Sequence, residues 1–184
     1  MENKGKVIII SGPSGVGKGT VVKRLLEIDQ KIAVSVSATT RQRREGEVHG
    51  VHYFYITREE FEDNIKNGRM LEYTQYNGNY YGTLQSHVRD LQDNGKTVIL
   101  EIEVDGATQI KKKLPDAITV FMVAPSEEEV ERRLRKRNTE CEEVIQKRLA
   151  IAKGEMAHAK EYDYVVCNDD VDNAANRILD ILKD

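Results

Sequence analysis

The sequence lacks tryptophan and has only three phenylalanines, three prolines and two cysteines among its 184 residues. Cys141 and Cys167 lie far apart and match neither a metal-binding spacing nor a disulfide framework, so we expect two free thiols in a reducing cytosol. No apolar run approaches the length that spans a membrane, and the first residues, MENKGKVIII, lack the hydrophobic core and cleavage site of a secretory signal. These absences predict a cytoplasmic protein.

The chain also has no large excess of positive or negative charge. The chain carries 28 Lys and Arg residues against 31 Asp and Glu residues, a formal net charge of −3. That balance gives no support to a nucleic acid or a membrane surface as a partner, so any anion site must be a local concentration of positive charge. Internal repeats and long linkers are also absent, and the length fits one domain.

The pattern of apolar residues predicts an α/β fold with an inserted lobe. The predicted strands cover residues 7–10, 33–37, 53–56, 70–76, 97–103, 118–123 and 164–167. The predicted helices cover residues 18–28, 57–68, 86–95, 126–137 and 172–184, the first with Val21, Val22, Leu25 and Leu26 on its inner side. Four strands, beginning at 7, 97, 118 and 164, are almost wholly apolar, which is typical of a parallel sheet covered on both faces. Residues 53–83 are instead polar and rich in tyrosine, and Asn77-Gly78 is typical of a tight hairpin turn.

The stretch SGPSGVGKGT, residues 11–20, lies between the first strand and the first helix. Gly12, Gly15 and Gly17 allow consecutive backbone N–H groups to point at one anion, and Lys18 can reach its outer phosphates. The pattern G-x-x-x-x-G-K between a strand and a helix therefore predicts a phosphate-binding loop. The alternative, an ordinary glycine-rich turn with an incidental lysine, is disfavoured by that context.

A hydroxyl residue normally follows the lysine and helps to hold magnesium, but here Gly19 intervenes before Thr20. Thr20 can still offer its hydroxyl to a phosphate oxygen. The metal is then expected to be held mainly by phosphates and water, which magnesium tolerates.

A second anion site is predicted around Arg41, Arg43, Arg44 and Tyr53. Two guanidinium groups three residues apart can converge on one phosphate, and a tyrosine hydroxyl adds a donor. A solvated basic loop remains the alternative. Glu103, at the expected end of a buried strand, is also a functional candidate because charge there is costly unless it is used.

The motifs GPSGVGK, TTRQRREGEVHGVHY, LEY, GNYYGT, LEIEVDG, TECEEVIQKRL and VVCNDD occur in the order and approximate spacing found in guanylate kinases. Over nearly its whole length the chain resembles the bacterial type of this family, which transfers the γ-phosphoryl group of ATP to GMP. The resemblance implies a three-layer fold of the P-loop nucleoside monophosphate kinases. Such a fold has a mainly parallel five-stranded core sheet, an inserted mixed α/β lobe that binds GMP, and a helical lid. The corresponding ranges are about 1–36, 84–125 and 150–184 for the core, 37–83 for the lobe and 126–149 for the lid.

The resemblance also implies residue roles. The ATP site is assigned to Gly12, Pro13, Ser14, Gly15, Val16, Gly17, Lys18, Gly19 and Thr20, with Asn168 near adenine. The GMP phosphate is assigned to Arg41, Arg44, Tyr53 and Tyr81, and guanine to Ser37, Glu72, Thr83 and Glu103. Lys18, Arg41 and the lid arginines Arg133, Arg137 and Arg148 are assigned to the transferred phosphoryl group. Glu101 is assigned to Mg²⁺ through water, on the same strand face as Glu103.

The guanine assignment agrees with the chemistry of the base. Guanine presents two adjacent donors, from which one carboxylate accepts, whereas adenine presents an acceptor at the same edge. Such a bidentate contact discriminates by about 1–3 kcal/mol.

Two alternatives are kept open: a non-catalytic guanylate-kinase-like module that binds proteins, and a P-loop switch or a kinase for another small acceptor. We expect GMP and ATP as partners and dGMP as a second acceptor, and leave open whether the chain forms a homodimer.

Overall fold

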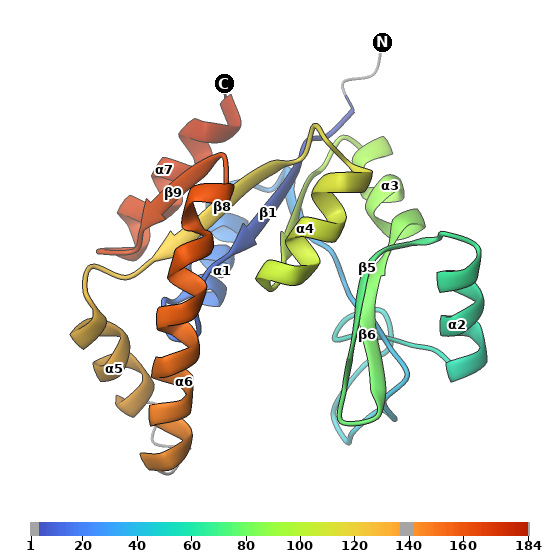
Figure 1. The fold of residues 1–184 in the computed structure, drawn as a ribbon. Coiled ribbons are helices and arrows are strands. Elements are labelled where there is room, and N and C mark those ends of the chain that lie inside the picture. Colours follow the sequence, from blue (N-terminus) through green and yellow to red (C-terminus); the bar gives the residue numbers. More distant parts are fainter. Residues whose placement is uncertain (1–3, 137–141, 184) are drawn as a thin grey trace.

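A five-stranded parallel sheet forms the centre of the computed structural model, which describes residues 4–136 and 142–183. Its strand order is β2-β7-β1-β8-β9. The strands are β1 (Val7–Ser11), β2 (Ile32–Val34), β7 (Thr97–Glu101), β8 (Ile118–Val123) and β9 (Tyr164–Cys167). The predicted parallel core sheet is therefore confirmed. Two arms extend from this core in the same direction (Figure 1).

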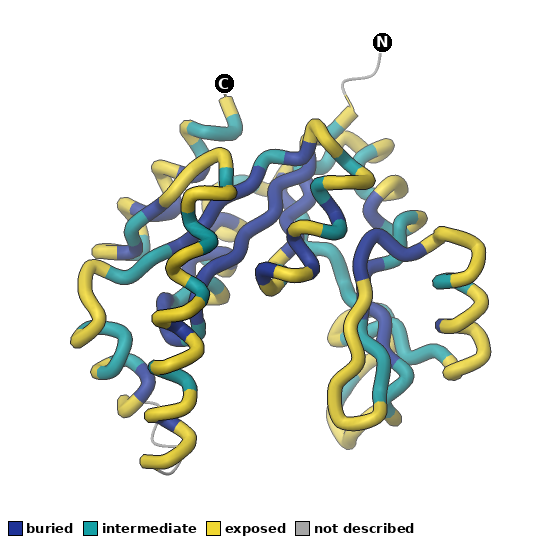
Figure 2. The backbone as a smooth tube through the Cα atoms, viewed as in Figure 1, coloured by how far each residue is buried: buried dark blue, intermediate teal, exposed yellow. Residues whose placement is uncertain are grey.

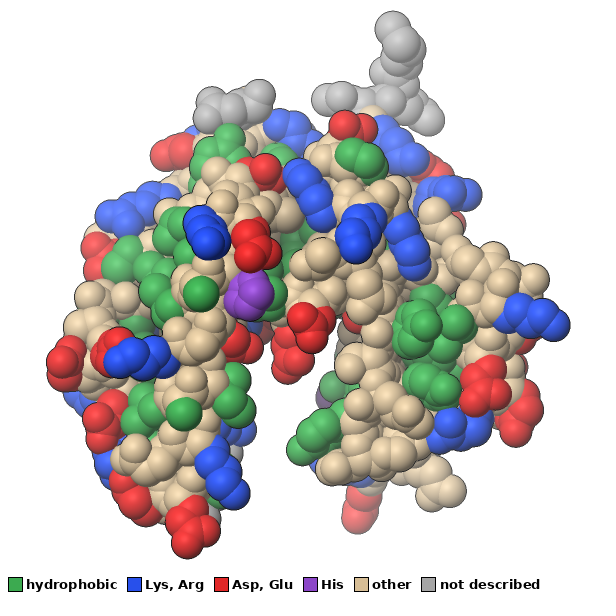
Figure 3. All heavy atoms as spheres, viewed as in Figure 1, with side chains coloured by type: hydrophobic (Ala, Val, Ile, Leu, Met, Phe, Trp, Pro, Cys, Tyr) green, Lys and Arg blue, Asp and Glu red, His purple; other side chains and the backbone are tan. Residues whose placement is uncertain are grey.

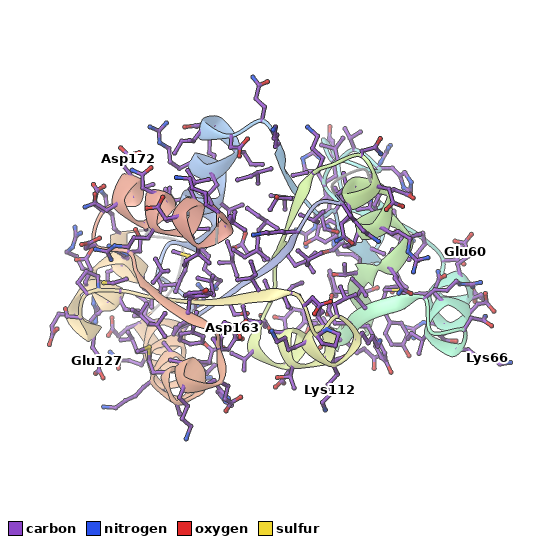
Figure 4. The ribbon with its side chains drawn as sticks, turned by 90° about the horizontal axis from the view of Figure 1, so that it is seen from above. Glu60, Lys66, Lys112, Glu127, Asp163 and Asp172 are labelled. Carbon is purple, nitrogen blue, oxygen red and sulfur yellow. The ribbon has the colours of Figure 1, made fainter. Side chains whose placement is uncertain are left out.

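Helices cover both faces of the core sheet. They are α1 (Lys18–Ile28) and α7 (Val171–Lys183) on one face, and α3 (Gln85–Asp93) and α4 (Val104–Lys113) on the other. Side chains alternate along β1, so Ile8 and Ile10 pack toward α1 and α7, while Val7 and Ile9 pack toward α3 and α4. The central strands β1, β7 and β8 are accordingly among the most buried parts of the chain (Figure 2). Viewed from above, Asp172 of α7 and Lys112 of α4 lie on opposite sides of them (Figure 4).

One arm is the inserted lobe, built on a second sheet of order β4-β3-β6-β5. Its elements are β3 (Ala38–Thr39), β4 (Phe54–Tyr55), α2 (Arg58–Lys66), β5 (Met70–Tyr76) and β6 (Asn79–Leu84). Phe61 of α2 packs with Met70 and Ala38 in a small core of its own. The predicted hairpin turn is confirmed, since Asn77 and Gly78 have φ of 47° and 77°.

The other arm consists of α5 (Glu127–Lys136) and α6 (Glu142–Glu155), followed by the 3-10 helix η1 (Met156–Glu161). Arg137 and Cys141 lie outside the described residues. The α6 helix continues past residue 149, where the sequence analysis placed the end of the lid. Cys167 is a free thiol, as expected.

The structure adds two strands and two α-helices to the predicted ranges, β3, β6, α4 and α6, and two predicted strands end earlier than expected. The strand predicted at 97–103 ends at Glu101, and Glu103 is an exposed residue that precedes α4, a helix that was not predicted. Glu101 and Glu103 therefore do not share a strand face. The argument that Glu103 must be functional because it ends a buried strand is wrong, since Glu103 is exposed and lies outside the strand. The strand predicted at 33–37 stops at Val34, because the chain there leaves the core sheet for the second sheet. Within the described ranges, no helix is long and apolar enough to cross a membrane.

The packing of α1 predicts unequal effects of two adjacent leucines. Leu25 is fully buried against α7, whereas Leu26, expected on the inner side, is 39% exposed. Leu25→Ala should lower the free energy of unfolding by about 3 kcal/mol, because the deletion leaves a cavity in a packed core. Leu26→Ala, the matched control, should change it by less than about 1 kcal/mol. Urea denaturation followed by circular dichroism measures both, and equal losses would contradict the packing described.

Candidate active site

The predicted phosphate loop connects β1 to α1 and is closely packed on two sides, against the backbone of Met122 and the side chain of Asn168. Gly12 has φ of 143°, and a Cβ on it would lie 2.2 Å from the carbonyl oxygen of Met122. Gly17 has φ of 91°, and a Cβ on it would lie 2.5 Å from Nδ2 of Asn168. Side chains are therefore excluded at both glycines, and the loop backbone is left to line the site.

The helix that follows the loop begins with positive groups and without a side-chain cap. Lys18 is its first residue, Gly17 is the N-cap, and no acidic residue lies in the first turn. The free N–H groups and the helix dipole favour an anion at this end. The Nζ of Lys18 donates to the carbonyl oxygens of Gly12 and Pro13, which directs the ammonium over the loop.

The carboxylate of Glu101 lies beside Gly19, the position at which such loops normally carry a hydroxyl residue. A Cβ built on Gly19 would be 3.8 Å from Oε1 and 4.0 Å from Oε2 of Glu101. Carboxylate oxygens beside a phosphate loop suit a hydrated magnesium ion, which keeps several waters and few protein ligands. The described residues contain no group of three or more His, Cys, Asp or Glu side chains that could hold a metal by themselves. The donor set therefore fits an ion held mainly by phosphates and water.

Arg133 connects the arm formed by α5 and α6, which is the predicted lid arm, to the phosphate loop. Its Nη1 donates to the carbonyl oxygen of Val16 at 3.0 Å, its Nη2 donates to that of Asn168 at 2.9 Å, and Glu129 accepts from its Nε at 2.6 Å. The side chain of Asn168 donates to the same Val16 oxygen at 2.8 Å. Within the described part of the chain, Oδ1 of Asn168 is buried without a hydrogen-bond partner, so one acceptor beside the loop is left over.

The other predicted lid arginines are less informative. Arg148 lies half-buried on α6, on the same arm as Arg133, and Arg137 is outside the described residues.

A pocket of about 410 Å³ lies between the second sheet, in the inserted lobe, and α4 of the core. Its lining includes the predicted residues Ser37, Tyr53, Glu72, Tyr81, Glu101 and Glu103. Thr83 is buried beside it and donates from Oγ1 to Oε1 of Glu72 at 2.7 Å. The structure therefore brings the residues predicted to read a base into one place.

Glu72 is the unusual group in this pocket because it is a carboxylate that is only 5% exposed. Burial raises the pKa of Glu72, while the hydrogen bond from Thr83 and the charge of Lys113 act in the opposite direction. A buried carboxyl with a single side-chain donor can still accept from a ligand.

Gly106 of α4 was not singled out from the sequence, yet the position of Glu72 depends on it. A Cβ on Gly106 would lie 2.5 Å from Cγ2 of Ile102 and 3.2 Å from Oε2 of Glu72. Since α4 itself was not predicted, no sequence signal pointed to this contact.

Arg41 is held in place by Glu47, a residue to which the sequence analysis gave no role. Nη2 of Arg41 lies 2.7 Å from Oε1 of Glu47. The other carboxylate oxygen of Glu47 accepts from the backbone N–H of Arg44 at 2.8 Å. The rings of Tyr53 and Tyr55 lie 5.6 and 5.9 Å from the guanidinium carbon of Arg41. The side chain of Arg44 is exposed, and the sequence signal for Glu47 was only an acid within a basic segment.

The phosphate loop and the Arg41 region lie on opposite sides of an open notch between the two arms. The space-filling view shows this notch hollowed below the core, with acidic side chains at its closed end (Figure 3). The predicted anion sites are thus on separate elements, one at the end of β1 and the other after β3 in the inserted lobe.

Comparisons with known proteins support one family. The guanylate kinase family matches residues 4–184. A guanylate kinase of Oceanobacillus iheyensis is 48% identical over 183 residues, which covers 100% of this chain and 89% of that protein. One of Streptococcus pyogenes serotype M3 is 52% identical over 184 residues, covering 100% and 87%.

Solved structures support the same family assignment. The crystal structure of guanylate kinase from Anaplasma phagocytophilum has a TM-score of 0.73 and 34% identity, covering 99% of this chain and 86% of that one. A shikimate kinase from Bacteroides thetaiotaomicron has a TM-score of 0.51 at 14% identity, covering 97% and 98%, and shows a likeness of fold alone.

The contact between Arg41 and Glu47 predicts an acidic titration. The hydrogen bond from Arg41, together with the weaker effect of the one from the backbone N–H of Arg44, lowers the pKa of Glu47 from 4.5 to about 2. Because the folded value is depressed, the pair contributes stability above about pH 4.5 and loses it as the pH falls toward 2. A carboxyl NMR titration should find this low value, and in Arg41→Ala the pKa should rise toward 4.5. A Glu47 carboxyl that titrates near 4.5 in the unsubstituted protein would contradict the pairing.

Proposed function

Since the chain belongs to the guanylate kinase family, we propose that it transfers the γ-phosphoryl group of ATP to GMP, giving ADP and GDP, in the purine nucleotide metabolism of the cytoplasm. The observation that carries this proposal is the pairing of two different sites across one notch. A backbone-lined phosphate loop lies on the core, and a buried carboxylate, Glu72, lies in the pocket of the opposite arm.

On the donor side, the loop residues 12–20 bind the phosphates of ATP. The uncapped start of α1 supplies backbone N–H groups, and Lys18 neutralises charge on the outer phosphates. The leftover acceptor of Asn168 suits the amino group of adenine. Mg²⁺, held by the phosphates and by waters that Glu101 accepts from, screens the charge of the phosphate chain when it is bound.

On the acceptor side, Arg41, Arg44, Tyr53 and Tyr81 bind the phosphate of GMP. Glu72 accepts from the two adjacent N–H donors of guanine, while Ser37, Thr83 and Glu103 complete the contacts to the base. The assigned groups contact base and phosphate and leave the ribose 2′-hydroxyl unused, so dGMP is a second acceptor.

The transfer itself needs alignment and charge neutralisation rather than a covalent intermediate or a general base. Lys18 and Arg41 approach the reacting groups from the two sides, and the lid arginines Arg133, Arg137 and Arg148 complete the site when the lid arm closes. Closure also excludes water, which would otherwise hydrolyse ATP. No feature of the described residues favours the alternative of a non-catalytic protein-binding module.

An assay of ADP formation with ATP and each nucleoside monophosphate tests the proposal. ADP should form with GMP and dGMP and stay near background with AMP, CMP or UMP. ADP release that is independent of the acceptor, or that is equal with AMP and GMP, would contradict it.

Removal of the loop ammonium should abolish most of the activity. Lys18→Ala should lower kcat by about 100-fold or more, because one preorganised cationic donor at the transferred group is lost. Lys23→Ala, which removes an exposed lysine from the same helix, should leave kcat within about twofold. Steady-state kinetics with ATP and GMP measure both variants, and normal turnover by Lys18→Ala would exclude the assigned role.

Removal of the base-reading charge should relax selectivity. Glu72→Gln should lower the ratio of kcat/KM for GMP to that for AMP by about tenfold or more, since a bidentate base contact is worth about 1–3 kcal/mol. Thr83 can still donate to the amide oxygen, so the pocket should remain folded. A ratio that stays the same in a stable variant would count against the assignment of guanine to this pocket.

A further inference from the structure

Gly106 lies where α4 meets the carboxylate that is assigned to read guanine. It is buried in the first turn of this helix and lines the same pocket as Glu72. A Cβ at this position would lie 2.5 Å from Cγ2 of Ile102, 3.2 Å from Oε2 of Glu72 and 3.5 Å from Cγ of Glu72. Ile102 and Glu72 therefore already occupy the space that a side chain at residue 106 would need.

Ile102 is fixed to the core sheet and has little freedom to make room. Its backbone N–H donates to the carbonyl oxygen of Ile10 at 3.1 Å, and its carbonyl oxygen accepts from the hydroxyl of Ser11 at 2.7 Å. Ser11 is fully buried at the end of β1. A shift of Ile102 would break these hydrogen bonds and leave buried polar groups unsatisfied, which is costly.

The strand that carries Glu72 is held at a fixed distance from α4. The side chain of Gln109 accepts from the backbone N–H of Tyr73 at 3.4 Å and donates to its carbonyl oxygen at 3.3 Å. Lys113, in the last turn of α4, donates from Nζ to the carbonyl oxygen of Met70 at 2.6 Å. The two contacts lie on either side of Glu72 along β5, so the strand cannot move away from α4 without breaking one of them.

The two carboxylate oxygens of Glu72 have different neighbours. Oε1 accepts from Oγ1 of Thr83 at 2.7 Å, whereas Oε2 is the oxygen that faces Gly106. A carboxylate that accepts from two adjacent N–H donors needs both oxygens in register with them. Thr83 thus fixes one end of the carboxylate, and the missing side chain at Gly106 fixes how close the other end lies to α4.

We propose that Gly106 determines base specificity through Glu72, because its missing side chain lets the carboxylate lie against α4 with both oxygens directed at the paired donors of guanine. Gly106 acts on Glu72 rather than on the nucleotide, so it is a positioning residue. This rests on the proposed function in taking GMP as the ligand of the pocket.

Gly106→Ala tests the proposal by isothermal titration with GMP and AMP. The Kd for GMP should rise about tenfold or more, while that for AMP, which lacks the paired donors, should change by less than about twofold. Gly154→Ala is the matched control, since Gly154 also lies within a helix but a Cβ on it would have no neighbour within 4 Å. This control should leave both Kd values unchanged.

A background of Ile102→Ala separates positioning from damage to the helix. It removes the atom 2.5 Å from the new Cβ, and Glu72 supplies the other two nearest atoms. Because alanine favours a helix more than glycine does, Gly106→Ala/Ile102→Ala should have a thermal midpoint no lower than that of Ile102→Ala. The double variant should nevertheless bind GMP about tenfold more weakly than Ile102→Ala does.

A double-mutant cycle tests whether the effect passes through the carboxylate. Added to Glu72→Gln, Gly106→Ala should weaken GMP binding by less than about twofold further, since the two residues act as one unit. An equal loss with and without the Glu72 carboxylate would overturn the proposal, as would a loss that appears only with a lowered thermal midpoint.

The unsubstituted protein distinguishes this inference from the proposed function. If it does not bind GMP in preference to AMP, the proposed function fails and this inference fails with it. If it has that preference and Gly106→Ala keeps it, the inference about Gly106 alone is overturned.

Discussion

Close packing around the phosphate loop is the constraint on which the rest of the structure depends. The loop is fixed from β8 by the contact of Gly12 with Met122, and from the segment after β9 by the contact of Gly17 with Asn168. The lid arm joins it where Arg133 and Asn168 share the carbonyl oxygen of Val16. A phosphate chain bound at this loop would therefore be positioned against the core sheet.

The inserted lobe holds its charged groups, Arg41 and Glu72, in position before any ligand binds. Arg41 is neutralised by Glu47 and flanked by two tyrosine rings, so its guanidinium is oriented before a phosphate arrives. Glu72 is buried at a cost that Thr83 offsets only in part. Both sites favour ligands that complete their hydrogen bonds, an anion in one case and adjacent N–H donors in the other.

Most of the core and the phosphate loop could be predicted, because apolar strands and glycine spacing are local signals. The contacts that hold the charged side chains in place could not be predicted from the sequence. Glu47 is visible in the sequence, but its contact with Arg41 depends on the path of the loop between β3 and β4. The mostly apolar stretch TVILEIE suggested a longer strand, so α4 and the role of Gly106 were missed.

The central claim is that one nucleotide pair can bridge the loop and the Arg41 site across the notch. Calorimetric titration with adenosine and guanosine joined through five phosphates tests this most directly. The account predicts one molecule bound per chain, with binding suppressed by either ATP or GMP. Binding of two molecules per chain, or suppression by only one of the two nucleotides, would contradict it.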